Sequence, residues 1–139
     1  MQYRQSGNTY LVRFDRGEEI VEKLKKLCED EQIRLGRVEA IGAADEAVIG
    51  VYDLARKEYH TETIREFAEI TGLNGNITAM DGKPYIHLHA TLADRHHQVR
   101  GGHVIGMRVG ATCEMFVTVF DGAVDRRKDE ELGINLWSF

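Results

Sequence analysis

Several features are missing from the sequence, and each absence excludes a class of protein. No apolar run approaches the ~20 residues that a membrane-spanning helix needs, which excludes an integral membrane protein. Residues 1–6 are polar and lack the apolar segment of a secretory signal, so a cytoplasmic protein is expected. Only two cysteines are present. Cys28 and Cys113 both lie in apolar patterns, which predicts buried, reduced thiols instead of a disulfide framework.

Positive charge is also scarce. The 139 residues include 18 Lys and Arg against 23 Asp and Glu, a net charge of −5. Phosphate contacts supply much of the affinity of nucleic-acid binders, so DNA binding would require these few cations to gather on one face. Known catalytic motifs are missing too: there is no G-x-x-x-x-G-K-[ST], no G-x-G-x-x-G that opens a helix, no G-x-S-x-G and no H-E-x-x-H.

The patterns that are present predict one domain, residues 1–139, with an α+β fold. The spacing of the apolar residues between Ile20 and Cys28 predicts one face of a long helix. Asp15 is the expected N-cap, with Glu18 three residues later as in a capping box, and the helix is expected to end near Glu31. Alternating runs predict a mostly antiparallel sheet packed on this helix, with strands at 10–14, 37–41, 48–52, 61–70, 76–80, 85–92, 104–109, 114–120 and 134–137. Gly42 is expected to close the strand at 37–41.

The strand at 85–92 carries the residues most suggestive of chemistry. Alternation places Tyr85, His87 and His89 on the face opposite the apolar residues. The two imidazoles are then about 7 Å apart along the strand, close enough to converge on one metal ion. The third candidate is His103, because the preceding Gly101–Gly102 pair would let the backbone turn sharply toward the strand. The alternative interpretation is a pair of solvated histidines.

Three converging histidines would have a defined chemistry. They leave a zinc ion with an open fourth position, the pattern of catalytic sites, where the pKa of a bound water falls toward neutrality. Glu39 and Glu66 are candidates for a hydrogen-bond partner of this site or a general base, or are ordinary surface residues. Arg95 and Arg100, with the nearby Arg108, could bind a carboxylate, a phosphate or a nucleic-acid backbone. Their alternative is an ordinary charged surface.

Two further segments are expected to have structural roles. The charge run at 125–131 is predicted to be a solvated loop. The apolar end at 132–139 holds the only tryptophan, Trp137, and would be a liability unless it packs in the core or against a neighbouring chain.

Together these motifs resemble a known family, the PPC (plant and prokaryote conserved) domain, in its prokaryotic single-domain type. The resemblance is carried by residues 75–77, 81–84, the His-Leu-His-Ala run at 87–90 and the Gly-Gly-His run at 101–103, supported by residues 14–19, 40–43 and 49–53. It implies an antiparallel sheet on one long helix, a homotrimer, and a metal, zinc, at His87, His89 and His103. It also implies a DNA-binding or regulatory role.

The charge of the chain opposes the DNA-binding part of that resemblance. No Arg-Gly-Arg-Pro hook is present, and three chains of −5 would carry −15. Duplex DNA would then be repelled unless one patch formed from the cations Arg95, Arg100, Arg126, Arg127 and Lys128. The alternative function is a metal-dependent enzyme or small-molecule binder that uses the open three-histidine zinc site. A third hypothesis is a trimeric interaction module whose histidines are purely structural.

Overall fold

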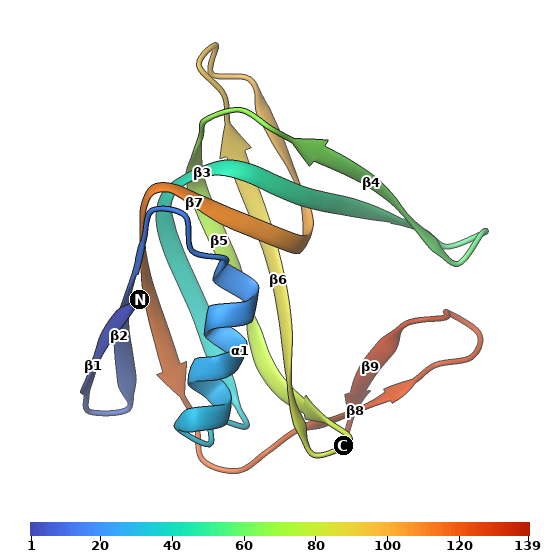
Figure 1. Cartoon of the computed structure of the whole chain (residues 1–139). Coiled ribbons are helices and arrows are strands. Elements are labelled where there is room, and N and C mark those ends of the chain that lie inside the picture. The colour runs from blue at the N-terminus through green and yellow to red at the C-terminus, as the bar shows by residue number, and fades with distance from the viewer.

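The computed structural model describes all residues, 1–139, and contains one helix and nine strands (Figure 1). The elements in chain order are β1 (Gln2–Ser6), β2 (Thr9–Asp15), α1 (Ile20–Asp30), β3 (Gly36–Asp53), β4 (Glu58–Ile64), β5 (Ala68–Met80), β6 (Lys83–Ala93), β7 (Val99–Val119), β8 (Asp125–Lys128) and β9 (Asn135–Ser138). All strand pairs are antiparallel except the short contact between β5 and β8. The predicted mostly antiparallel sheet is therefore confirmed.

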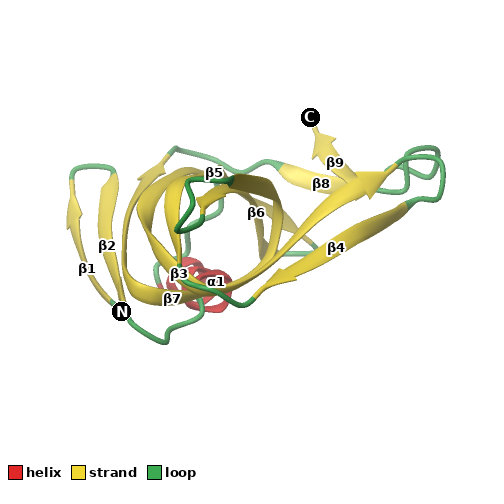
Figure 2. Ribbon diagram, turned by 90° about the horizontal axis from the view of Figure 1, so that it is seen from above, coloured by secondary structure: helices red, strands yellow, loops and turns green.

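Four strands close into a ring. β7 pairs with β3, β3 with β5, β5 with β6, and β6 returns to β7. Figure 2 looks along this ring, with the helix beneath it and hairpins extending to either side. The β1–β2 hairpin lies on one side, and the β3–β4 extension and the β8–β9 hairpin both lie on the other, where Figure 1 shows β4 above β8 and β9. Such closure pairs the backbone of the central strands on both sides, which leaves few free edges.

Glycine lets two long strands bend through this ring without ending. A Cβ on Gly42 would lie 2.3 Å from the carbonyl oxygen of Thr112, so only glycine permits this approach of β3 to β7. The pairing of β3 with β7 shifts register beside Gly42, as at a β-bulge. The prediction that Gly42 closes a strand was therefore wrong, and the runs at 37–41 and 48–52 belong to one strand. Likewise 104–109 and 114–119 are both part of β7, which ends one residue before the predicted 120, whereas 61–70 is divided between β4 and β5.

The helix is shorter than expected. It has 11 residues, and its N-cap is Glu19, whose carboxylate accepts from the Glu22 backbone N–H. Asp15 belongs to β2 instead, although its backbone N–H still donates to the Glu18 carboxylate, 3.0 Å away. The expected length and the Asp15 cap were therefore wrong, whereas the expected end near Glu31 is confirmed, since Glu31 is the C-cap. Four residues of α1 are buried against the sheet: Ile20, Leu24, Leu27 and Cys28.

One apolar cluster of 27 buried residues joins α1 to the inner faces of the strands. Both cysteines belong to it as free, buried thiols, as predicted. Burial raises the pKa of each thiol, Cys28 and Cys113, to about 12. α1 does not have the length and apolar character that crossing a membrane would require.

The C-terminal segment differs from the expected solvated loop and from packing of its end in the core, whereas packing of that end against a neighbouring chain stays a prediction. The charge run at 125–131 is not a solvated loop throughout, because residues 125–128 form β8 and Arg126 is 8% exposed. The apolar end does not pack in the core either. Trp137 is 47% exposed and Phe139 is 97% exposed.

Candidate metal centre

Strand pairing brings the three predicted histidines together. His87 and His89 point to one face of β6, and His89 is the cross-strand partner of His103 on β7. The glycines before His103 do not turn the chain as predicted, since β7 runs on through them. They instead allow close packing: a Cβ on Gly101 would lie 2.6 Å from the Ala90 carbonyl oxygen, and one on Gly102 would lie 2.7 Å from the Gly50 carbonyl oxygen.

The three imidazoles could hold one metal ion. One nitrogen from each ring lies within 4.8 Å of the others. The Nε2 atoms of His87 and His89 are 3.2 Å apart. Two nitrogens bound at ~2.0–2.1 Å to a tetrahedral zinc would be separated by about 3.3 Å. The group contains no cysteine, aspartate or glutamate, so the side chains of this chain offer three ligands and not four.

The surroundings favour the uncharged form of two of these imidazoles, His87 and His103. Burial, followed by the charges of His103, Arg126 and His89, lowers the pKa of His87 to about 4. Burial and His89 also lower the pKa of His103. Neutral imidazole is the form that binds metals, so these shifts leave the ring nitrogens free to act as ligands at neutral pH.

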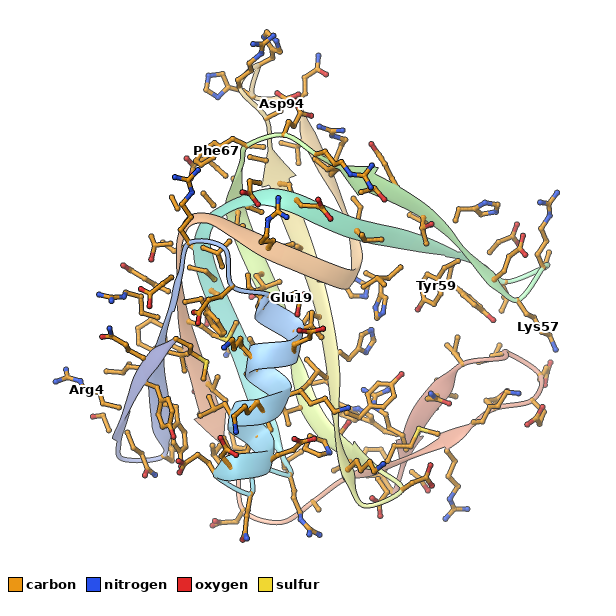
Figure 3. All side chains as sticks on the ribbon, viewed as in Figure 1. Arg4, Glu19, Lys57, Tyr59, Phe67 and Asp94 are labelled. Carbon is orange, nitrogen blue, oxygen red and sulfur yellow. The ribbon has the colours of Figure 1, made fainter.

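His103 packs against an aromatic ring. The Tyr59 ring stacks on it, with ring centroids 4.9 Å apart and planes inclined by 27°. Tyr59 projects from β4, on the side of the molecule where β4 faces the β8–β9 hairpin (Figure 3). His103 Nδ1 is the one buried side-chain nitrogen or oxygen in the chain that lacks a hydrogen-bond partner. A buried polar atom without a partner is costly, so this nitrogen is available to a ligand or a cation.

Arg126, predicted from the sequence to lie in a solvated loop, lies on the same face as the histidines. Arg126 donates from Nε to Thr78 Oγ1 at 2.8 Å and from Nη2 to Asn76 Oδ1 at 2.8 Å. Asn76 is the cross-strand partner of His87, and Thr78 is the partner of Tyr85. Directly opposed residues of a strand pair share a face, which places the guanidinium beside the histidine group.

The sequence predicted one of the three residues that lie around the histidines, Tyr85, but not Arg126 or Tyr59. Tyr85 alternates with His87 and His89, so its place on the histidine face was predictable from the sequence. Arg126 and Tyr59 gave no such signal, because each reaches the group only through strand pairing over a long sequence separation.

The other candidate residues have partners outside the group of His87, His89 and His103. Arg100 forms ion pairs with Glu62, at 3.0 Å, and with Glu66. Arg95 donates to the His96 ring at 3.1 Å. Glu66 therefore faces an arginine and not the candidate metal centre.

Two more candidates are also ion-paired on the surface. Glu39 accepts from Arg37 at 3.0 Å. Arg108 bonds to Asp45 at 2.7 Å and lies 3.7 Å from Glu46.

The cations proposed for DNA do not form one patch in this chain. Asp94 marks the tip between β6 and β7 that carries Arg95, and this tip lies at the end of the molecule opposite β8 (Figures 1 and 3). Within β8, Arg126 is buried and Lys128 lies 3.6 Å from Glu130.

Comparison with known proteins places this geometry in a family. The model of the Plants and Prokaryotes Conserved (PCC) domain matches residues 1–121, whereas none of the curated proteins matches the chain. A proposed DNA-binding protein from Bacteroides thetaiotaomicron has 30% identity and a TM-score of 0.97, covering 99% of this chain and 96% of its own. A second proposed DNA-binding protein, from Ralstonia eutropha, has 35% identity and a TM-score of 0.92, with 99% and 95% covered.

A third solved structure matches this chain over its full length. It is described as a metal-containing protein from Archaeoglobus fulgidus, with 35% identity and a TM-score of 0.90, covering 100% of this chain and 99% of its own. The family match extends over most of the sequence, and the fold agrees over nearly all of it. The chain belongs to the Plants and Prokaryotes Conserved (PCC) domain family, the one that its histidine and glycine motifs resemble.

Proposed function

We propose that this chain is a zinc protein whose three-histidine centre binds or transforms a small molecule. The observation that carries this proposal is the convergence of His87, His89 and His103, with one nitrogen of each ring within 4.8 Å of the others and no fourth side-chain ligand. A zinc ion with three histidine ligands keeps a position for substrate or water, where it polarises a carbonyl group or lowers the pKa of water.

The residues of the chain prepare this centre in three ways. β6 and β7 hold the imidazoles on paired strands, which fixes their spacing more firmly than a loop would. Burial keeps His87 and His103 neutral and therefore able to ligate. Tyr59 covers one side of the His103 ring and restricts its rotation.

Elemental analysis of the purified chain tests this proposal. We expect about one zinc ion per chain, lost on chelation and restored on adding zinc. His87→Ala, His89→Ala and His103→Ala should each reduce the zinc content, while His60→Ala is a matched control because His60 is exposed and pairs with Asp53 instead. Full zinc retention in all three variants would refute the ligand assignment.

DNA binding is a second candidate function, supported by the descriptions of two similar structures. The charges of this chain oppose it, since Arg100 and Arg108 are each paired with acidic residues and the net charge is −5. Titration of duplex DNA at low salt, where screening is weakest, decides between the candidates. Absence of binding under those conditions would eliminate DNA as a partner.

We also propose that the chain assembles as a homotrimer. Exposed apolar residues on neighbouring strands support an interface: Ile41 on β3 is 62% exposed and Phe116 on β7 is 56% exposed. An uncovered apolar face of this kind is typical of a protein contact. Light scattering should give three times the 15.8 kDa chain mass, and Phe116→Glu should reduce it. A monomer at micromolar concentration would contradict the trimer.

A further inference from the structure

Arg126 is a buried cation without a counter-charge. Its residue is 8% exposed, and its three hydrogen-bond acceptors are all neutral: Thr78 Oγ1, Asn76 Oδ1 and, at 2.7 Å from Nη1, the Asn135 carbonyl oxygen. No carboxylate forms a salt bridge with it, and it is the one buried arginine of the chain; the other arginines without such a partner are all exposed to water: Arg4, Arg16, Arg34, Arg95 and Arg127. Burying a charge without a counter-charge is costly, so an anion bound beside Arg126 would be stabilised by it.

The guanidinium still has donors to offer. Of its five N–H groups, three are used, which leaves one on each terminal nitrogen. Its carbon lies 4.5 Å from the centroid of the Tyr85 ring, so it is stacked in a fixed orientation. The Tyr85 hydroxyl accepts from Asn135 Nδ2 at 3.3 Å and keeps its own hydrogen as a further donor.

These donors lie beside the histidine group. Tyr85 precedes His87 by two residues on the same face of β6, about 7 Å along the strand. The spacing allows one small molecule to contact the metal at one end and the guanidinium at the other. The planar pair of oxygens in a carboxylate matches two N–H donors on one guanidinium.

We propose that Arg126, assisted by the Tyr85 hydroxyl, is the anion-binding residue of the centre, and that its ligand is a small carboxylic acid with a second oxygen-bearing group for the metal. This inference rests on the proposed three-histidine metal site. A bound carboxylate would supply the counter-charge that the folded chain does not provide for Arg126.

Cobalt-loaded protein provides a test that does not require a known reaction. The visible absorption of bound cobalt reports any molecule that enters its coordination sphere, so acetate, malonate, succinate and glutarate can be titrated in turn. Imidazole serves as a neutral probe that needs the metal alone. We expect at least one dicarboxylate to bind about tenfold or more tightly than acetate, because it gains a charge-assisted contact with Arg126.

Three variants separate this role from a structural one. In Arg126→Met, the dicarboxylate should bind no more tightly than acetate, while the affinity for imidazole should stay within about twofold of the wild type. Arg126→Lys keeps the charge but lacks the planar fork, and should lose part of the advantage. Tyr85→Phe leaves the arginine in place and should weaken the binding of the dicarboxylate without weakening that of imidazole. If Arg126→Met does not fold, the carboxylate titrations of the wild type, Arg126→Lys and Tyr85→Phe still test whether Arg126 binds the anion.

The outcomes separate this inference from the proposed function. Failure to bind cobalt would overturn the metal site itself. Cobalt and imidazole binding with no preference for any dicarboxylate would leave the metal site standing and refute the role of Arg126. An advantage that survives Arg126→Met would refute that role as well.

Discussion

Gly75→Ala should weaken metal binding without removing any ligand. Gly75 lies on β5 against β6, where an added Cβ would be 2.0 Å from the backbone carbonyl oxygen of His87. Ordinary van der Waals contact begins at 3.4 Å, so the His87 backbone must move by about 1.4 Å. Metal–ligand distances tolerate only ~0.2 Å, far less than this displacement.

Zinc affinity of the Gly75→Ala variant, measured by competition with a chelating dye, should fall by about tenfold or more. The metal-free protein should also lose about 1–3 kcal/mol of stability, because the close-packed strands are forced apart. Gly72→Ala is the matched control on the same strand, since its Cβ would meet the Asn74 side chain at an ordinary 3.5 Å. Unchanged zinc affinity and stability in Gly75→Ala would refute this reasoning.

Three more perturbations have defined outcomes. Chelation should lower the melting temperature of the zinc-loaded protein by roughly 8–10 °C, since a ligand at 100 times its Kd adds ~2.7 kcal/mol; an unchanged melting temperature would argue against a bound metal. Cys28 and Cys113 should resist alkylation at pH 8 until the chain unfolds, because burial raises the pKa of each thiol to about 12; rapid labelling of the native protein would contradict this. Asp94→Ala should lower the urea midpoint at pH 7, because the carboxylate accepts from the Gln98 and His96 backbone N–H groups. These hydrogen bonds hold the pKa of Asp94 below its usual value, so its contribution is present above pH ~4 and lost as pH falls through the lowered pKa, and the two proteins should converge in acid.

The sequence predicted the local features of the candidate site well. Alternation alone placed Tyr85, His87 and His89 on one face of a strand, because side-chain direction along a strand has a period of two. The Asp81–Gly82 turn between β5 and β6 was also predictable, since it is a typical hairpin signal.

The sequence could not show what distant strands bring together. Arg126 lies in a run of charged residues that reads as solvated, and its burial depends on β8 lying beside β5. The bends of β3 and β7 were mistaken for strand ends, because a glycine at a bulge and a glycine in a turn look alike in sequence. The helix was overestimated because Asp15 and Glu18 do form one hydrogen bond of a capping box, but at the end of β2.

The central claim is that three imidazoles of one chain share a metal ion. X-ray absorption of the zinc-loaded protein tests it most directly, because imidazole rings give a characteristic scattering pattern. We expect three ring nitrogens at ~2.0–2.1 Å from zinc in the wild type, and fewer in His103→Ala. Zinc without imidazole neighbours, or a spectrum unchanged by His103→Ala, would contradict it.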